Sequence, residues 1–408
     1  MDKMTRRRHP ARMPRLSRRE KGTVAIQVAV FLTMLLFAAA IAIDIGRWVV
    51  VRHQLQNAAD AAALAGAHTL PGQLAASAVP ATWTAATTAA DTAATQYAGD
   101  NSANGKAASA QTILVGYYDV ANVPAANVPT SLSQTITSPT DKPAVLVTVG
   151  LAGGKNLPLT LGQMFGVTSV QASATAVAII SAPGTALPGV LFPIAMNQCV
   201  YQNPSYWKNG QPIAGQEIQL GNGAMTGYAP LSNCTGVAAQ WTALTLDSNP
   251  GAYGPCSGMS PSSVPTIDCL MTNGNGPSLT VGNNISIQPG VKTSIYNSFP
   301  VTPPMQVTLP VVADGSTMSA GGGGDTPIVG FASFEIDYVI GANNNVQPPC
   351  NSNPVCANSK GQPPCTKCLI GHLTSGLAGG TTAGGTTASY YGAVTPPILA
   401  QLPSGAWY

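Results

Sequence analysis

The sequence predicts an α+β fold in which a single N-terminal transmembrane helix continues into a long extracytoplasmic helix. An α+β domain and a β-rich, disulfide-containing C-terminal region follow. Three observations predict this: one uncharged apolar run near the start of the 408 residues, an Ala-rich helical pattern after it, and eight cysteines confined to residues 184–408. Only 8% of the residues are charged, against about a quarter in ordinary soluble domains. The 43 Gly and 34 Pro indicate short strands joined by many turns.

The charges are divided unevenly along the chain. Residues 1–21 hold nine of the eighteen Lys and Arg residues against Asp2 and Glu20 alone, a net charge of +7. Beyond His53 there are seven basic and twelve acidic residues. This distribution argues against a nucleic-acid-binding body. The basic tail at 1–21 is typical of the cytoplasmic side of a membrane span.

A transmembrane helix is predicted over residues 22–45. It begins GTVAIQVAVFLTMLLFAAAIAI, and none of these twenty-two residues is charged. A helix of that length covers about 33 Å, which matches a hydrocarbon core of about 30 Å. The basic residues before it place the N-terminus in the cytoplasm and the body outside. A cleaved signal peptide ending at Ala38-Ala39-Ala40 is the alternative, but the helical pattern continues past Ala40.

Three residues mark the predicted membrane exit: Asp44, Arg47 and Trp48. Tryptophan settles at the membrane–water interface because its ring is amphipathic. Asp44 and Arg47 are three residues apart on a helix, so they can pair with each other. The alternative is that both simply lie among lipid head groups.

An Ala-rich helical extension is predicted over residues 46–70. No Pro occurs between Lys21 and Leu70, so one helix of about 45 residues can run on until Pro71-Gly72 ends it. Small residues recur on one face and would let another helix approach closely. The partner would be another copy, a neighbouring helical protein or the chain's own segment 84–98, and a solvated alanine helix is the alternative. The helix-packing candidates are Ala38, Ala42, Gly46, Ala58, Ala62 and Gly66.

Residues 71–182 are predicted to form the α+β domain. Its helix is TAATTAADTAATQYA at 84–98, followed by a loop at 99–105. Ser181-Ala182-Pro183-Gly184 marks a boundary, after which 183–408 form the β-rich region. Segments with alternating or β-branched residues predict strands at 113–119, 144–151 and 169–180.

The cysteines fall into two sets, and an even number in an exported chain predicts disulfides whose pairing within each set stays open. Cys365-Thr366-Lys367-Cys368 with His372 nearby could also form part of a zinc site, and a CxxC can be a redox pair. The oxidising compartment and irregular spacing favour disulfides, so we expect no metal. The candidates are Cys199, Cys234, Cys256, Cys269, Cys350, Cys356, Cys365 and Cys368.

No catalytic site and no cofactor are expected. His372 is the only histidine after His68, and the chain has no G-x-S-x-G, Walker or HExxH motif. Glu335 and Asp337 alternate to the same face of a predicted strand, and we interpret them as its solvated side rather than an acid–base pair. The sequence therefore does not indicate an enzyme.

The run from Gly22 to Ala67 resembles the N-terminal segment of the TadE/TadG-like proteins of the tight-adherence (Flp pilus) assembly system. Gly22, the exit AIDIGR at 42–47 and LQNAADAAALAGA at 55–67 carry the resemblance. A weaker similarity continues through ILVGYYD, AVLVTVGL and LGQMFGVTSVQASATAVAII to about residue 180.

The resemblance implies a non-enzymatic, TadG-like component of pilus assembly. It would be a single-pass protein of the bacterial inner membrane, with a periplasmic body and a pilin-like domain at 71–182. Its partners would be the lipid bilayer and other pilin-like or Tad assembly proteins, and an oligomer stays open.

The chain departs from related patterns in two places. Type IV pilin-like helices usually carry Glu five residues after the Gly at the processing site, where this chain has Gln27, and Thr23 follows Gly22. This favours a permanently anchored component over a processed pilin. Some longer TadG-like proteins carry a von Willebrand A domain with a D-x-S-x-S metal motif. Here Asp314 and Ser316 are followed by Met318 in place of the last serine, so we predict a turn.

An anchored adhesin or carbohydrate-binding module is the alternative function. Tyr201, Tyr206, Trp207 and Trp241 could offer stacking faces to a sugar, although aromatic residues of a small core have the same composition. An exported hydrolase would depend on His372.

Overall fold

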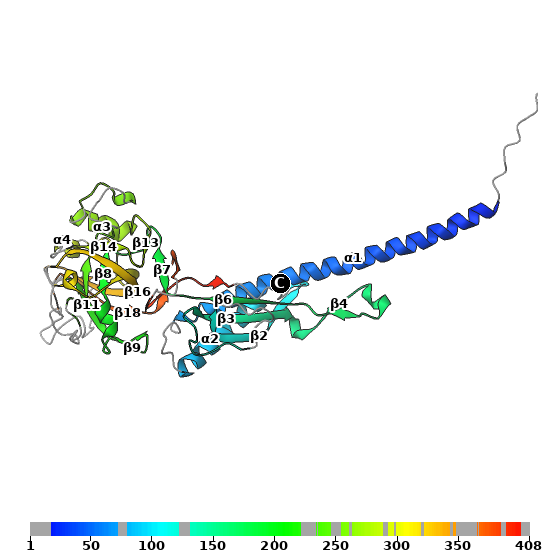
Figure 1. Cartoon of the computed structure of the whole chain (residues 1–408), viewed down its shortest axis with the longest axis horizontal. Coiled ribbons are helices and arrows are strands. Elements are labelled where there is room, and N and C mark those ends of the chain that lie inside the picture. Colours follow the sequence, from blue (N-terminus) through cyan, green and yellow to red (C-terminus); the bar gives the residue numbers. More distant parts are fainter. Residues whose placement is uncertain are drawn as a thin grey trace, which may run out of the picture.

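The computed structural model describes residues 18–71, 80–121, 131–221, 236–245, 254–260, 263–288, 293–297, 299–319, 322–342, 346–347, 367–384 and 389–400, with Cys234 and Cys365. Two lobes follow one long helix (Figure 1). The proximal lobe packs along the C-terminal part of that helix, and the distal lobe lies beyond its end. The predicted α+β class is confirmed, with helices and strands in both lobes.

The long helix is α1, Arg18–Ala67, and its 50 residues cover about 75 Å. Its sequence lacks Pro and is rich in Ala and Leu, so no residue interrupts it. It ends at Ala67, three residues before the end of the predicted extension at 70, and Leu70 N–H bonds to the Ala67 carbonyl in the turn that follows. The second helix, α2 at Pro80–Gly99, contains the predicted segment 84–98 and starts with Pro, which suits a first turn.

Five antiparallel strands form the proximal sheet, in the order β1-β2-β3-β6-β23. Helix α1 packs on β3 and β6, and α2 packs on α1 and β2, so both helices cover one face. The core between these layers includes Leu55, Trp83 and Val147. The strands are β1 Ser102–Ala103, β2 Lys106–Asp119, β3 Asp141–Leu151, β6 Ser173–Ile179 and β23 Ile398–Leu399.

The predicted strands 113–119 and 144–151 lie within β2 and β3. The predicted strand 169–180 divides in two, because its first residues form β5 (Ser169–Val170), which pairs with β4 (Leu157–Pro158) outside the sheet. Strand β23 comes from far along the chain and pairs with Ala178 and Ile179 of β6. The proximal sheet thus takes an edge strand from the region that follows residue 183.

The distal lobe is built on a nine-stranded sheet whose main path runs β11-β18-β16-β15-β8-β12, while β14, β17 and β21 also pair with β16. Strand β16 has 17 residues and is the common neighbour. The hydrophobic core of the distal lobe includes Phe334, Ile336 and Trp241. The strands are β8 Ile194–Asn197, β11 Glu217–Gly221, β12 Ala239–Trp241, β14 Asn284–Ile287, β15 Met305–Val312, β16 Gly324–Ile340, β17 Val346–Gln347, β18 Cys368–Thr374 and β21 Ser389–Tyr391.

Short elements complete the distal lobe. Ser263 caps helix α3 (Val264–Asn273) by accepting a hydrogen bond from the Thr266 amide. Helix α4 is Thr293–Asn297. A three-stranded sheet joins β13 (Leu279–Thr280), β7 (Pro183–Ala186) and β20 (Thr381–Ala383). Two small pairs remain: β9 Trp207–Lys208 with β10 Gln211–Pro212, and β19 Gly376–Leu377 with β22 Ala393–Val394.

Candidate functional site

The surroundings of α1 change abruptly along its length. Apolar side chains of its N-terminal half stand free of the protein, with Ile26 67% and Leu35 68% exposed. From Val51 onward they enter the core, where Leu55 and Ala58 are completely buried. The segment Val24–Ala67 is long and apolar enough to span a membrane. An exposed apolar surface of this size on one helix is typical of a segment that crosses a bilayer.

Asp44 follows directly after the uncharged run of the helix, and its carboxylate is bound by the backbone of a loop. It accepts hydrogen bonds from the backbone amides of Thr160 at 3.0 Å, Leu161 at 2.9 Å and Gly162 at 2.9 Å. These amides begin the 3₁₀ turn Gly162–Phe165, so Asp44 satisfies donors that such a turn leaves unpaired. Only 7% of the residue is exposed.

The loop belongs to a hairpin, residues 155–171, that contains β4 and β5 and is called the exit hairpin below. It extends along α1 away from the distal lobe (Figure 1). A glycine is required at 162, because a Cβ there would lie 2.8 Å from the Val167 carbonyl oxygen. Gly166 has φ +79°, a conformation that favours glycine. The hairpin is therefore shaped for close contact with the helix.

Arg47 and Trp48 hold the same hairpin. Arg47 donates from Nη1 to the Pro158 carbonyl at 3.4 Å and from Nη2 to Asn104 Oδ1 at 3.0 Å. Trp48 Nε1 donates to the Gln171 carbonyl at 3.3 Å. The pairing of Asp44 with Arg47 that the spacing allowed is not formed, because each side chain is occupied by the exit hairpin or its neighbour. The ion pairs in the described part of the chain involve His372 instead.

The predicted ridge of small residues divides into two halves with different surroundings. Ala58, Ala62 and Gly66 are buried within the proximal lobe. A Cβ on Gly66 would lie 2.9 Å from Val145 Cγ1 of β3 and 3.5 Å from the Ala90 carbonyl of α2. Of the three partners considered, the chain's own segment 84–98 packs here. The small side chains let α1 lie closely between α2 and the sheet.

The other half of the ridge is Ala38, Ala42 and Gly46, and these residues are exposed. A Cβ on Gly46 would have no neighbour within 4 Å. This half makes no close contact with another part of the described chain, so it is the half that another protein could reach.

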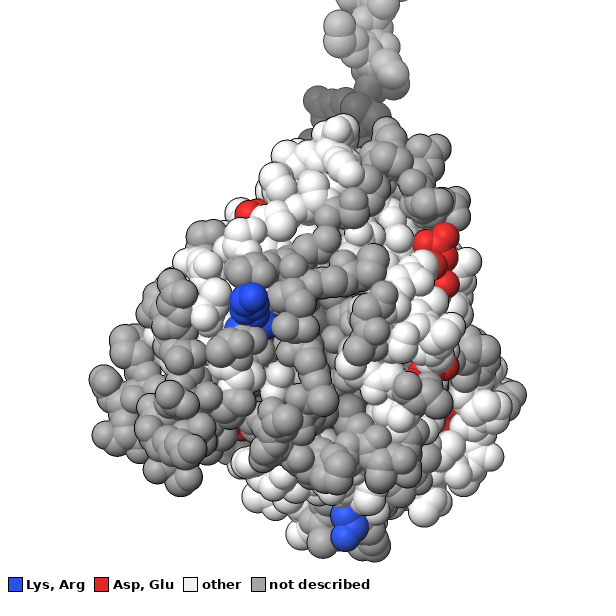
Figure 2. Space-filling model, turned by 90° about the vertical axis from the view of Figure 1, so that its left-hand side faces the viewer, with Lys and Arg blue, Asp and Glu red and all other residues white. Residues whose placement is uncertain are grey.

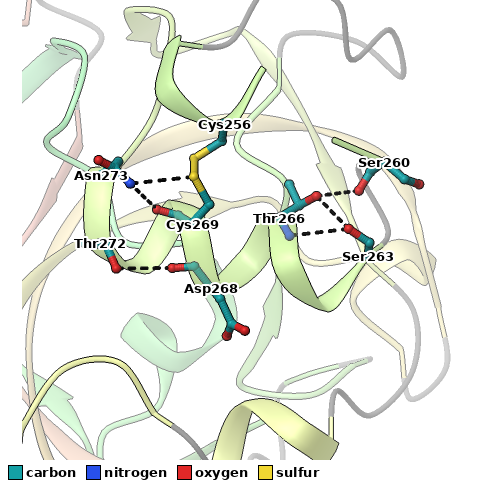
Figure 3. The surroundings of a disulfide bond; sticks show 8 residues. All are labelled: Cys256, Ser260, Ser263, Thr266, Asp268, Cys269, Thr272 and Asn273. Carbon is teal, nitrogen blue, oxygen red and sulfur yellow. Dashed lines mark hydrogen bonds between the residues drawn. A yellow bond between two sulfur atoms is a disulfide. The ribbon is translucent and has the colours of Figure 1, made fainter. Parts of the chain in front are cut away.

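Three disulfides join described cysteines: Cys199–Cys234, Cys256–Cys269 and Cys365–Cys368. Figure 3 shows the second, in which α3 carries Cys269 and Asn273 Nδ2 donates to the Cys269 carbonyl at 3.0 Å. The predicted disulfide character of these cysteines is confirmed. The Cys365–Cys368 bond leaves neither thiolate for zinc. Cys350 and Cys356 lie outside the described residues.

His372 is bound to carboxylates instead of cysteines. Its Nδ1 lies 2.7 Å from Asp337 Oδ2 and its Nε2 3.8 Å from Glu335 Oε2. Strand register explains the cluster, because Glu217 of β11, His372 of β18 and Glu335 of β16 are direct neighbours. A bulge between Ile336 and Tyr338 brings Asp337 to the same histidine. The hydrogen bond to Asp337 is the main cause that raises the pKa of His372 above its ordinary value.

Burial, followed by the charge of Asp337, raises the pKa of Glu217 to about 6. Ligand atoms of Glu335, Asp337 and His372 lie within 4.8 Å of one another, close enough to hold a cation. Ion pairing of the histidine accounts for this geometry, so we assign no metal. The interpretation of Glu335 and Asp337 as a merely solvated face missed their shared histidine.

The aromatic residues considered for sugar stacking lie mainly in the core. Tyr206 and Trp241 are buried, and Trp241 Nε1 donates to the Tyr296 hydroxyl at 2.9 Å. Tyr201 is buried between Trp207 and Tyr391, with ring centroids 5.0 Å and 4.8 Å away. Trp207 is half-buried in the same contact. Buried rings have no free face for a sugar.

The remaining motifs behave as turns and surface. Asp314 precedes a 3₁₀ turn at Ser316–Met318, and its Oδ1 accepts a hydrogen bond from Asn197 Nδ2 at 2.8 Å.

On the end of the distal lobe, Figure 2 shows a few separated charged side chains among the described residues. The described residues of that face form no continuous basic stripe of the kind that nucleic acid requires.

These features define a class of protein: an α+β domain built on the second half of a helix whose first half is a candidate membrane span. Comparison with known families makes the class specific. Residues 22–69 match the model described as putative Flp pilus-assembly TadE/G-like, and residues 65–178 match the model described as putative Tad-like Flp pilus-assembly. The resemblance found in the sequence is confirmed over this part of the chain. No curated protein and no solved structure gives a significant match.

The two matches divide the proximal lobe at the end of α1. The first covers α1 from Gly22, including the exit residues, and the second covers α2 and the strands up to β6. The match therefore includes both the exit hairpin and the carboxylate that binds it. The distal lobe lies outside both models, so nothing about its role comes from them.

Proposed function

We propose that this protein is a membrane-anchored, non-enzymatic component of Flp/Tad pilus assembly, of the TadG-like type. It crosses the bacterial inner membrane once, with its N-terminus in the cytoplasm and both lobes in the periplasm. One observation carries the proposal: the helix that begins as an exposed apolar run becomes the central core element of a domain that matches the Tad models. The basic tail at 1–21 supports the orientation.

In this function the helix joins the membrane to the assembly rigidly. Asp44, Arg47 and Trp48 hold the proximal lobe against the helix at the membrane exit. The exposed small residues Ala38 and Ala42 then offer a packing face to a helix of another pilin-like or Tad assembly protein. The buried half of the ridge serves the fold of the lobe itself.

The anchor is retained in this proposal. Gln27 cannot pair with the amine that cleavage after residue 21 would create, as a glutamate would. Ala38-Ala39-Ala40 lie in the middle of the continuous helix α1, which is an unfavourable position for a peptidase. The intact mass of the protein purified from membranes measures this directly. A product that starts just after Ala40 would contradict retention of the anchor, and a product that starts at Gly22 would show that the basic tail is removed.

The test of the function is genetic. In a bacterium that carries this chain and a Flp pilus, deletion of its gene should abolish Flp pilin on the cell surface, and the wild-type gene should restore it. Ala42→Leu should restore it less well, because it fills the exposed packing face, whereas Ala39→Leu should behave as wild type if the partner contacts the ridge alone. Normal surface pilin in the deletion strain would overturn the proposal.

The adhesin alternative receives no support from the distal aromatics, because their rings are occupied by each other and by the core. The hydrolase alternative is not favoured either. Among the described residues, His372 is joined to Asp337 and Glu335, an arrangement without a hydroxyl nucleophile.

A further inference from the structure

The depth of the exit hairpin relative to the membrane span follows from its bonds to α1. Three backbone amides at 160–162 bind the carboxylate of Asp44, the residue that ends the uncharged run. This loop therefore lies level with the last turn of the span. Its neighbours include Ile41, one turn earlier on the helix.

A cavity of about 400 Å³ separates the helix from this hairpin. Ile41 and Ile45 of α1 line one side of it, and Leu159, Val167 and Val170 line the other. The two isoleucines belong to the exposed apolar surface of the span, being 43% and 55% exposed. The cavity is thus continuous with the surface that the bilayer covers.

The exit hairpin carries a single charge, Lys155 at its first position. No residue from 156 to 171 carries a charge. Val167 lies near the tip of the hairpin, beside the apolar cavity, and is 50% exposed. An exposed valine next to an apolar cavity indicates a surface that an apolar partner covers.

The backbone of the tip has its polar groups largely satisfied from within. Val167 N–H bonds to the Gly162 carbonyl, and Leu159 N–H bonds to the Thr168 carbonyl. Together with the amides that Asp44 accepts, these bonds meet the requirement for backbone near lipid. A short irregular loop fits the interfacial region, whereas the hydrocarbon centre would exclude it.

From these four observations we propose that the exit hairpin inserts into the outer interfacial region of the bilayer. Lipid acyl chains there cover Val167 and fill the apolar cavity. The protein is then anchored at two points, the helix and the hairpin, which fixes the tilt of the proximal lobe on the membrane. The proposal rests on the membrane placement of residues 22–43 given above.

The experiment places a fluorescent amino acid at one position of the full-length chain in phosphatidylcholine–phosphatidylglycerol vesicles. Lipids brominated near the head-group end of the acyl chains quench a probe at the interface, and lipids brominated near the chain ends quench a probe at the centre of the bilayer, so both kinds of lipid are used. Val167 is the test position. Leu35 in the span and Met259, an exposed methionine of the distal lobe, are the controls. Thermal unfolding of each labelled protein checks that it is folded.

We expect quenching at Val167 and Leu35 and none at Met259. Quenching at Leu35 without quenching at Val167 overturns the hairpin proposal while leaving the anchored function intact. Absence of quenching at Leu35 contradicts the anchor itself. A third outcome is that the Val167 probe is not quenched but its emission shifts to the blue as the protein density in the vesicles rises. This result would show that a second copy of the chain covers the surface, and it also overturns the lipid proposal.

Discussion

The backbone amide of Gly162 donates a hydrogen bond of 2.9 Å to Oδ2 of Asp44 across 118 positions of sequence. This bond and its two neighbours at Thr160 and Leu161 make the last turn of the candidate span part of the folded lobe. The helix and the domain therefore meet through a specific contact as well as through the covalent chain.

Replacing Asp44 should release the exit hairpin. In Asp44→Ala, the amides of Thr160, Leu161 and Gly162 lose their acceptor, so their hydrogen exchange should become faster than in the wild type. Mass-spectrometric exchange on the full chain in lipid nanodiscs measures it. Asp91→Ala removes an exposed carboxylate of α2 and should leave these amides unchanged. Equal exchange in the two variants would show that the carboxylate does not hold the loop.

The two glycines of the small-residue ridge should respond oppositely to a larger side chain. Gly66→Leu forces atoms against Val145 and the Ala90 carbonyl and should destabilise the proximal lobe by about 1–3 kcal/mol. Gly46→Leu meets no atom within 4 Å and should leave stability unchanged or slightly higher. Thermal unfolding in detergent compares them, at roughly 2–4 °C for each kcal/mol. Similar melting temperatures would contradict the packing described for Gly66.

The disulfides should differ in their contribution to stability. The Cys199–Cys234 bond has a sequence separation of 35 and the Cys365–Cys368 bond one of 3. Chain entropy then gives about 4 kcal/mol for the first and about 2 kcal/mol for the second. The double variants Cys199→Ser/Cys234→Ser and Cys365→Ser/Cys368→Ser, unfolded in urea without reductant, should follow that order. A reversed order would mean that native-state contacts, rather than loop length, decide the contribution.

The histidine cluster should make the distal lobe more stable at low pH. The pKa of Glu217 is raised to about 6, and that of His372 is raised above 6.5. Both groups thus bind more protons in the folded than in the unfolded state. Their contribution is complete below pH 4.5 for Glu217 and below pH 6.5 for His372, and it is lost as the pH rises through each folded pKa.

The melting temperature of the distal lobe should accordingly fall as the pH rises from 5 to 8. The corresponding loss in the free energy of unfolding is about 1 kcal/mol, because solvent screens both partly exposed side chains. The variant Glu217→Gln/His372→Gln should lack this component of the pH dependence. Asp325→Asn, which changes an exposed carboxylate of the same sheet, should retain it. Identical pH profiles for wild type and the double variant would contradict the assignment.

Much of the proximal lobe could be predicted because its signals are local. The helix α1 follows from an apolar run, an alanine pattern and the absence of Pro over one stretch of chain. Strands β2 and β3 are long and rich in apolar residues, so the predictions at 113–119 and 144–151 fall within them. Strand β23 has two residues, too few to show any periodicity.

The candidate site was predicted less completely, because its partners are distant in sequence. Asp44, Arg47 and Trp48 stood out at the end of the span, but their acceptors and donors lie in the exit hairpin and at Asn104. The uncharged segment with Gly162 and Gly166 is the sequence signal that points to a tight hairpin at this place. The contact of His372 with Asp337 depends on the register of two strands and a bulge, which the sequence does not display.

The pairing of β23 with β6 has a consequence for the order in which this protein is made. Residues 398–399 leave the ribosome long after the rest of the proximal sheet, so until then Ala178 and Ile179 present an open sheet edge. That edge could recruit a strand from a neighbouring nascent chain until its own arrives. A chaperone that shields sheet edges would therefore act on this protein late in its synthesis, and truncating the chain before Ile398 would prolong its need for one.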